Sequence, residues 1–419
     1  MNKYVVTMVV LAAFSVQLNA ADWTQFRGPN SAGISSESGL NFDGLARAKA
    51  VWTTPMTNGF SSITTNGDTV YTLISDGGNE HCIAVNAATG EQLWKSVALG
   101  SSDYGNGGGN AGARGNNGGD GPRSTPTISN GKVYALTAEL ILSCLDASTG
   151  KVAWQRNLVQ KNGGRLPKWK NAASPIIEGD SIFVNCGSAK GAFLAINKNN
   201  GEVIWSVGSD EMTHSSPVLA TIHNVRQVIF FAKSGLVSCD VNSGKVLWKQ
   251  AFKFNVSTAM SPIVDGDVVY CSAGYGVGSG AFRVSPSGNG FNVENLWFKV
   301  GNTLANHWST PIVKDGHLFG LFGFKKYAEC PLMCVNIRTG EVKWEKKGFG
   351  PGGVTLSGDT LVVLGDEGQL VAVKATTAGY QEVGRVDLLD GKAWGTPTIS
   401  NGRVFARTTK EGLCLKLGN

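Results

Sequence analysis

The sequence predicts an all-β protein, an eight-bladed β-propeller of four-stranded antiparallel blades closed by an N-terminal strand. Three observations predict this fold. The 419 residues include 56 Gly and only 16% charged residues, a composition that disfavours a helical or disordered chain. A turn pattern ending in Trp recurs along the chain. A second pattern, built around Pro, precedes the copies of the first.

The turn pattern has fixed spacing. Residues 84–94, Ala-Val-Asn-Ala-Ala-Thr-Gly-Glu-Gln-Leu-Trp, recur in similar form at 144–154. In five copies a Gly stands four residues before a Trp, and an Asn or Asp stands four residues before the Gly: Gly90 and Trp94, Gly150 and Trp154, Gly201 and Trp205, Gly244 and Trp248, and Gly340 and Trp344. A short Asx side chain bonds the backbone two residues on, and Gly accepts a positive φ. Each copy therefore predicts a tight turn between two strands, with the Trp anchoring the second.

The Pro pattern marks where each unit begins. Pro follows Ser or Thr, and a Gly comes four or five residues later: Pro126 and Gly131, Pro175 and Gly179, Pro262 and Gly266, Pro311 and Gly316, and Pro397 and Gly402. Because Pro donates no hydrogen bond to a ladder, it belongs at the start of a strand. Each unit thus predicts strand A after the Pro, strands B and C, the Asx-Gly turn, and strand D near the Trp.

The Trp residues count the blades. Seven of them mark D strands: Trp52, Trp94, Trp154, Trp205, Trp248, Trp297 and Trp344. Residues 350–387 supply a blade without its Trp, and residues 394–417 supply strands A to C only. The missing D strand is predicted at 48–52, so that the two ends of the chain share the eighth blade and no sheet edge stays open. Seven blades is the alternative count. We expect the propeller to span 47–419, with an N-terminal extension over 21–46.

The first twenty residues are typical of a secretory signal peptide, with Lys3, an apolar stretch over 4–16 and small residues at Ala20 and Ala21. A buried N-terminal strand is the alternative. The apolar run is shorter than the roughly 18 residues that span a bilayer, so no transmembrane segment is expected. The net charge, 37 − 31 = +6, is dispersed, which disfavours nucleic acid as a partner. We expect a periplasmic or secreted monomer.

The eight cysteines are expected to be mostly small buried packing residues. Cys144, Cys334 and Cys414 occupy one equivalent place in separate repeats. Such places lie too far apart for the roughly 4.4–6.8 Å Cα separation of a disulfide. Pairing of Cys330 with Cys334, or of Cys186 with Cys271, stays open.

The repeat resembles the pyrroloquinoline quinone (PQQ) type, found in quinoprotein alcohol dehydrogenases and in the propeller subunit of the outer-membrane β-barrel assembly machinery. The stretches Trp23-Thr-Gln-Phe-Arg-Gly-Pro-Asn30 and Gly121-Pro-Arg-Ser-Thr-Pro126 also resemble exported bacterial PQQ-like repeat proteins. The resemblance covers residues 23–417 and implies the propeller fold. It leaves the activity open, since one fold hosts many functions.

PQQ enzymes hold their cofactor between a Trp floor and a disulfide of adjacent cysteines, with Ca²⁺ bound by oxygen ligands and an Asp as base. This sequence has no adjacent Cys pair, and no cluster of acids stands at the A-strand starts, where the nearest are Asp210 and Glu211. We therefore expect a non-catalytic binding or scaffold protein of the cell envelope, with no certain cofactor. A PQQ-dependent alcohol dehydrogenase with an altered site is the alternative.

The start of each A strand faces the central channel of a propeller, so candidate site residues are those just before the Pro positions: Arg123, Trp169, Asn171, His214, Asn306, His307, Trp308, Lys392 and Trp394. Such residues are suited to a planar anionic ligand, through stacking and charge-assisted hydrogen bonds. The alternative is that the aromatic rings plug the channel. Envelope proteins, glycans and small anions are the expected partners.

Two further patterns are weaker. The Gly-rich stretch 105–121 predicts a flexible loop over the channel mouth. His214 and His307 belong to blades that are not neighbours, so we expect no metal site between them. We predict no catalytic residue and no metal ligand from the sequence.

Overall fold

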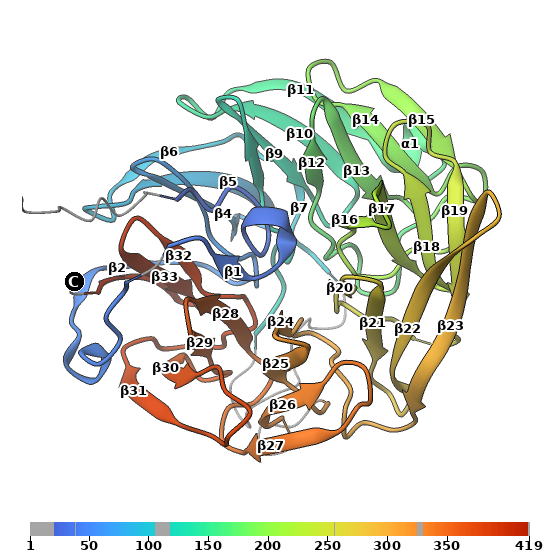
Figure 1. Ribbon diagram of the computed structural model, residues 1–419. Coiled ribbons are helices and arrows are strands. Elements are labelled where there is room, and N and C mark those ends of the chain that lie inside the picture. The colour runs from blue at the N-terminus through green and yellow to red at the C-terminus, as the bar shows by residue number, and fades with distance from the viewer. Residues whose placement is uncertain (1–20, 38, 105–117, 255, 325–329, 418–419) are drawn as a thin grey trace, which may run out of the picture.

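The computed structural model describes residues 21–37, 39–104, 118–254, 256–324 and 330–417. Within these residues the strands form eight sheets arranged in a ring around a central axis (Figure 1), which confirms the eight-bladed prediction. The expected signal peptide at 1–20 and most of the Gly-rich loop, 105–117, lie outside the described residues. None of the helices in the described part of the chain has the length and apolar character needed to span a membrane.

The first four blades each contain strands A to D in chain order. Blade 1 comprises β3 (Thr64–Asn66), β4 (Thr69–Asp76), β5 (Asn79–Asn86) and β6 (Gln92–Lys95); blade 2 comprises β8 (Thr127–Ser129), β9 (Lys132–Leu136), β10 (Ile141–Asp146) and β11 (Val152–Asn157). Blade 3 comprises β12 (Ile176–Glu178), β13 (Ser181–Asn185), β14 (Phe193–Asn197) and β15 (Val203–Val207); blade 4 comprises β16 (Val218–Ile222), β17 (Val225–Ala232), β18 (Gly235–Asp240) and β19 (Val246–Ala251).

The other blades continue the ring. Blade 5 comprises β20 (Ile263–Asp265), β21 (Val268–Ala273), β22 (Gly278–Ser287) and β23 (Gly290–Lys299); blade 6 comprises β24 (Ile312–Lys314), β25 (His317–Leu321), β26 (Leu332–Asn336) and β27 (Val342–Lys346). Blade 7 comprises β28 (Gly353–Ser357), β29 (Thr360–Leu364), β30 (Gln369–Lys374) and β31 (Glu382–Asp387); blade 8 comprises β32 (Thr398–Ser400), β33 (Arg403–Arg407), β34 (Glu411–Lys416) and β2 (Ala50–Pro55). Short strands β1 (Ile34–Ser35) and β7 (Gly100–Ser101) pair with β28 and β5.

The repeated Trp fastens six of the eight blades to the next one; in blade 4 Trp248 donates to Gln227 of its own blade, and strand D of blade 7 has no Trp. The indole Nε1 of Trp52 donates to the carbonyl of Ala87, 3.0 Å away in the Asx-Gly turn of the following blade. A Cβ on Gly90 of that turn would lie 2.7 Å from the Trp52 ring, so Gly there permits close contact as well as a φ of 77°. Trp94, Trp154, Trp205 and Trp297 make the same contact with the turns that follow them. The fixed spacing of Gly and Trp in the repeat therefore serves a contact between neighbouring blades.

Blade 8 closes the ring with a strand from the other end of the chain. Strand β2 pairs antiparallel with β34, with Trp52 opposite Cys414. The same Trp–Cys pairing occurs in blade 2, between Trp154 and Cys144, and in blade 6, between Trp344 and Cys334. The N-terminal strand therefore occupies the ordinary D position, as the Trp count predicted.

Because Trp52 and Trp205 occupy equivalent places, we expect their replacement by Ala to lower the free energy of unfolding by similar amounts. Both are nearly buried, at 7% and 8% exposed, and both donate to a turn carbonyl at 3.0 Å. Truncating a large buried aromatic costs about 3–5 kcal/mol. Urea denaturation of Trp52→Ala and Trp205→Ala measures this directly. A Trp52→Ala variant as stable as the wild type would show that β2 is dispensable for closure.

The cysteines lie in the blades as packing residues. Cys82, Cys239 and Cys414 are fully buried. Cys186, Cys271 and Cys334 are buried thiols, so neither disulfide that the sequence left open is formed. Burial raises the pKa of the Cys334 thiol to about 12, which keeps it protonated and unreactive at neutral pH.

The segment over residues 22–37 closes the channel on the face where strands A and B are joined. It contains the 3₁₀ turn η1 (Pro29–Ser31), visible as the blue coil near the centre of Figure 1. Ile128 donates to the Thr24 carbonyl, Leu356 donates to the Gly33 carbonyl, and Glu37 accepts from the amides of Asn401 and Gly402. The segment thus bonds blades 2, 7 and 8 and leaves the opposite face as the place for a site.

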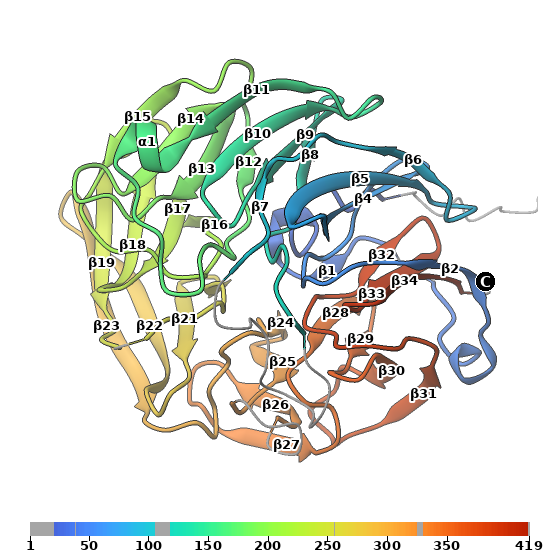
Figure 2. The same ribbon diagram turned by 180° about the vertical axis from the view of Figure 1, so that it is seen from behind.

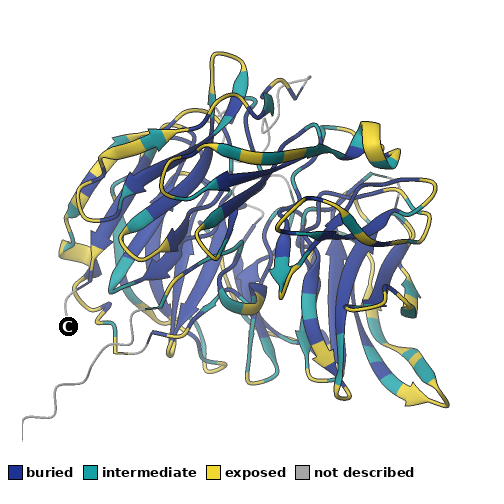
Figure 3. Ribbon diagram, turned by 90° about the horizontal axis from the view of Figure 1, so that it is seen from above, coloured by how far each residue is buried: buried dark blue, intermediate teal, exposed yellow. Residues whose placement is uncertain are grey.

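Figure 2 presents that opposite face, which carries the loops from strand D to the next strand A. The helix α1 (Leu158–Asn162) lies in one of these loops, capped by Asn157, whose side chain accepts from Gln160. A second 3₁₀ turn, η2 (Leu45–Arg47), packs beside β31 outside the ring. Seen from the side in Figure 3, buried residues run through the strands and exposed residues gather at turns and outer strands.

Candidate functional site

The predicted site residues form two clusters on the D-to-A face. The first cluster contains Arg123, Trp169 and His214. The Arg123 Nη1 donates to the Trp169 carbonyl at 3.0 Å, and the guanidinium lies 4.2 Å from the centre of the Tyr104 ring. The rings of Trp169 and His214 have centroids 6.3 Å apart. Three residues from loops of blades 2, 3 and 4 therefore lie together.

His214 is held in one tautomer. Its Nε2 donates to the Lys168 carbonyl at 2.9 Å, and its Nδ1 accepts from the Ser257 hydroxyl at 2.7 Å. Burial, together with the charges of Arg123 and Lys233, lowers the His214 pKa to about 4. The ring is therefore neutral at physiological pH and serves as a bridge between loops rather than as a cation.

The second cluster is an aromatic column of four stacked rings: Phe60, Trp394, Trp308 and Phe324. Centroid separations along the column are 4.8, 4.7 and 5.2 Å, with interplanar angles of 19°, 26° and 11°. Glycines make room at both ends, because a Cβ on Gly118 would lie 2.2 Å from Phe60 and one on Gly274 would lie 2.4 Å from Phe324. Each Trp of the column thus stacks on two other rings.

His307 packs edge-on against this column, 4.8 Å from Trp308 and 5.0 Å from Phe324. Its Nδ1 accepts from the Gly274 amide, and burial lowers its pKa to about 3. His214 and His307 come from blades 4 and 6, yet both bond the segment between them: His214 N donates to Thr258 O, and Ala259 N donates to His307 O. Among the described residues, no three His, Cys, Asp or Glu side chains are grouped to hold a metal ion.

Lys392 and Trp394 are joined by an acid that the sequence reasoning missed. The Trp394 indole donates to Asp366 Oδ1 at 2.5 Å, and the Lys392 ammonium lies 5.1 Å from the Trp394 ring centre. Burial lowers the Lys392 pKa, and Asp366 opposes that shift. Asp366 lies in a B-to-C loop, which an antiparallel blade places on the same face as the D-to-A loops. That topological signal was available in the sequence.

A second missed acid, Glu80, supports the Arg123 cluster. Tyr104 donates to Glu80 Oε1 at 2.7 Å, and the Ala138 amide donates to Oε2 at 3.2 Å. Burial raises the Glu80 pKa to about 7. The Arg123 guanidinium lies over the Tyr104 ring, so the hydrogen bond from Tyr104 to Glu80 positions the ring that Arg123 contacts.

Asn171 and Asn306 use their amide groups to hold the backbone. Asn171 Nδ2 donates to the carbonyls of Thr137 and Ala173 at 3.2 and 3.1 Å. Asn306 accepts from the Tyr270 hydroxyl and donates to the Leu321 carbonyl. Both asparagines are fully buried, so their amide groups hold the loops at the channel in position.

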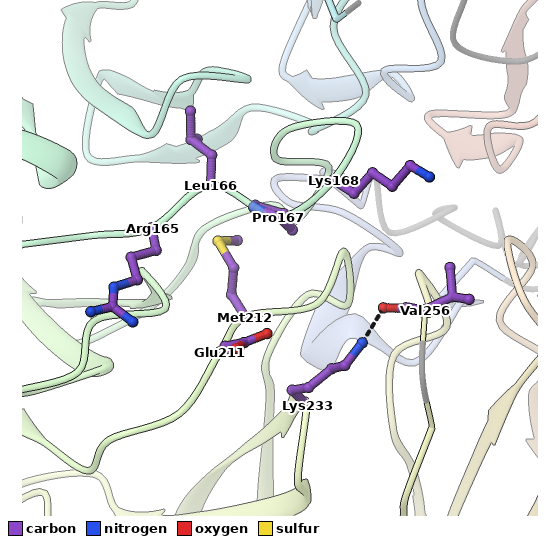
Figure 4. A pocket seen from close by; sticks show the side chains of 8 residues that line it. All are labelled: Arg165, Leu166, Pro167, Lys168, Glu211, Met212, Lys233 and Val256. Carbon is purple, nitrogen blue, oxygen red and sulfur yellow. Dashed lines mark hydrogen bonds between the residues drawn. The ribbon is translucent and has the colours of Figure 1, made fainter. Parts of the chain in front are cut away.

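A cavity of about 460 Å³ lies beside the first cluster (Figure 4). Its lining comes from loops of blades 3, 4 and 5 and consists of Arg165, Leu166, Pro167, Lys168, Glu211, Met212, Lys233 and Val256. The sequence reasoning singled out Glu211 as a nearby acid and missed the others. Lys233 stands in a B-to-C turn, the loop class that carries Asp366 as well.

The ring of repeats defines the class: a β-propeller of PQQ-like repeats. The family model described as outer membrane protein assembly factor BamB matches residues 79–321 and 327–415. The chain therefore belongs to this family. The BamB proteins of Shewanella oneidensis and Yersinia pestis are 22% identical over 268 residues and 25% identical over 244 residues. These matches cover 60% and 53% of this chain and 63% and 53% of the relatives, so the chain spans less than two thirds of their length.

Solved structures show the same fold. BamB from Moraxella catarrhalis has a TM-score of 0.60 and 15% identity, over 88% of this chain and 100% of that one. Quinohemoprotein alcohol dehydrogenase from Comamonas testosteroni has a TM-score of 0.65 and 14% identity, over 95% of this chain and 81% of that one. The chain thus shares its fold with both a BamB protein and a quinohemoprotein alcohol dehydrogenase.

Proposed function

We propose that this protein is a non-catalytic scaffold of the cell envelope that takes part in assembling outer membrane proteins. Family membership supports the role, because the matching relatives are named as outer membrane protein assembly factors. The role requires export, which residues 1–20 are expected to direct.

The observation that carries this proposal is the aromatic column. A planar cofactor in the channel needs a ring face on which to stack. Trp308 stacks on Trp394 and Phe324, and Trp394 stacks on Trp308 and Phe60. Since both tryptophans are engaged with rings of the chain itself, the column favours a filled channel mouth and binding through surrounding loops.

The second candidate function is a PQQ-dependent dehydrogenase with an altered site. The likeness in fold to the quinohemoprotein alcohol dehydrogenase favours it, as does Arg123 next to Trp169. A buried cation beside an aromatic ring is suited to an anionic planar quinone. The described residues offer no grouped acids for the Ca²⁺ that such enzymes use.

A cofactor titration separates the two functions. We expect purified protein with PQQ, Ca²⁺, an alcohol and a redox dye to show no turnover. We also expect no saturable quenching of Trp fluorescence at micromolar PQQ, because the column tryptophans are stacked on one another. Saturable quenching together with turnover would overturn the scaffold role. Deleting the gene in its own organism is expected to lower the amounts of outer membrane proteins, and unchanged amounts would contradict that role.

A further inference from the structure

The cavity of blades 3 to 5 has a charge imbalance that the scaffold role does not explain. Arg165, Lys168 and Lys233 line it, against one carboxylate, Glu211, which is exposed. Among the described residues, no acidic group lies within ion-pair distance of any of these three cations. The neighbouring Asp210 is used elsewhere, because the Ser234 hydroxyl donates to it.

Backbone hydrogen bonds hold the loops that carry the three cations. Arg165 N donates to Cys186 O at 2.8 Å, Lys170 N donates to Pro167 O at 2.9 Å, and Lys233 N donates to Glu211 O at 2.9 Å. The Lys233 ammonium is oriented by the Val256 carbonyl, 2.5 Å away (Figure 4). The Lys233 ammonium is therefore oriented before an anion binds, which lowers the entropy cost of binding.

The loop that carries Lys168 is also strained. Trp169 and Lys170, directly after it, have φ values of 66° and 55°, in the left-handed region that non-glycine residues rarely adopt. Two consecutive residues in that region cost free energy, and such strain gathers at ligand-binding loops. In this conformation the Trp169 carbonyl accepts from Arg123, and the Lys168 ammonium lies 4.8 Å from the centre of the Trp169 ring.

The cavity wall is apolar as well as charged. Met212 is 4% exposed, and Pro167 and Val256 lie beside it. The cavity also adjoins the first channel cluster. The His214 ring donates to the carbonyl of Lys168 and accepts from the hydroxyl of Ser257, the residue after Val256. The occupant that matches these walls is an anion with an apolar body.

We propose that this cavity binds an organic carboxylate with an apolar part, held by Lys168 and Lys233 beside Met212. Two sources share this chemistry: a free organic acid and the C-terminal carboxylate of an apolar peptide. Lysine donates charge-assisted hydrogen bonds to carboxylate oxygens, and Met212 provides a soft apolar contact. The site is separate from the aromatic column and does not depend on the scaffold role.

Calorimetric titration tests this site with phthalate as the free acid and with a short apolar peptide bearing a free C-terminal carboxylate. Uncharged phthalamide and the amidated peptide are the controls. We expect saturable binding of at least one carboxylate, weakening as salt screens the charges. Phthalate binding alone identifies a free acid as the source, and peptide binding alone identifies a chain terminus. Binding of the controls as tightly as the carboxylates, or no saturable binding of either carboxylate, would overturn the proposal.

Matched variants locate the bound anion. Lys168→Gln and Lys233→Gln are each expected to weaken carboxylate binding roughly tenfold, the loss of one charge-assisted hydrogen bond. Lys253→Gln, an exposed lysine in the loop between β19 and β20, is the control and should leave affinity unchanged. Lys168 is exposed, so its replacement preserves the fold even if Lys233→Gln lowers the melting temperature. Equal affinity in wild type and Lys168→Gln would place the anion elsewhere and refute the assignment.

Discussion

A variant lacking residues 21–54 is expected to aggregate or to be digested rapidly by proteases. The deletion removes most of β2, which leaves the edge of β34 without its partner strand and removes Trp52 from the contact between blades 8 and 1. Open strand edges pair with other chains. Losing the buried Trp alone costs about 3–5 kcal/mol, a large part of the roughly 5–15 kcal/mol by which a domain is stable.

Limited proteolysis and the thermal melting curve measure this outcome. The full-length Trp52→Ala variant is the comparison that separates loss of the whole strand from loss of the Trp contact alone. If the variant without residues 21–54 melted cooperatively at the wild-type temperature, the N-terminal strand would not be part of the closed ring.

Replacing Arg27 by Ala is expected to lower the free energy of unfolding by about 3–6 kcal/mol, from the loss of its two charge-assisted bonds to blade 6 at roughly 1.5–3 kcal/mol each. Arg27 is fully buried beside the start of β24, where Nη1 donates to Thr310 O at 2.5 Å and Nη2 donates to Pro311 O at 2.7 Å. Nε and Nη2 also donate to Ser31 O and Ala32 O. Burial lowers the Arg27 pKa to about 9. The carbonyl oxygens that accept from the guanidinium offset the cost of burying its charge.

Urea denaturation gives the measurement, with Arg47→Ala as the control. Arg47 is an exposed arginine in the same N-terminal segment, and surface substitutions usually change stability by about 0.5 kcal/mol or less. Arg27→Lys tests the geometry, because a single ammonium cannot reproduce the fork that reaches several carbonyls. An Arg27→Ala variant as stable as Arg47→Ala would show that the channel segment adds nothing to the closed ring.

The candidate site was only partly accessible from the sequence. Residues before the Pro positions, such as His214 and Trp308, were found because a repeat fixes which end of each A strand faces the channel. Phe60 was missed because strand A of blade 1 is preceded by Ile63 at the position where most other blades have Pro. Phe324, Asp366 and Lys233 were missed because the Pro pattern marks only the starts of the A strands, whereas these residues lie in B-to-C loops, which end on the same face.

The sequence by itself determined the blade count, the closing strand and the buried state of most cysteines. Each of these depends on contacts within a blade or between neighbouring blades, so the chemistry of one turn, repeated, is sufficient. Only the tertiary structure decided which side chains meet across the ring. The aromatic column, the bridge between His214 and His307, Arg27 beside β24 and the three cations of the cavity join loops far apart in the chain. Their contacts depend on how the blades are rotated about the axis and on the direction of each side chain, which no local pattern encodes.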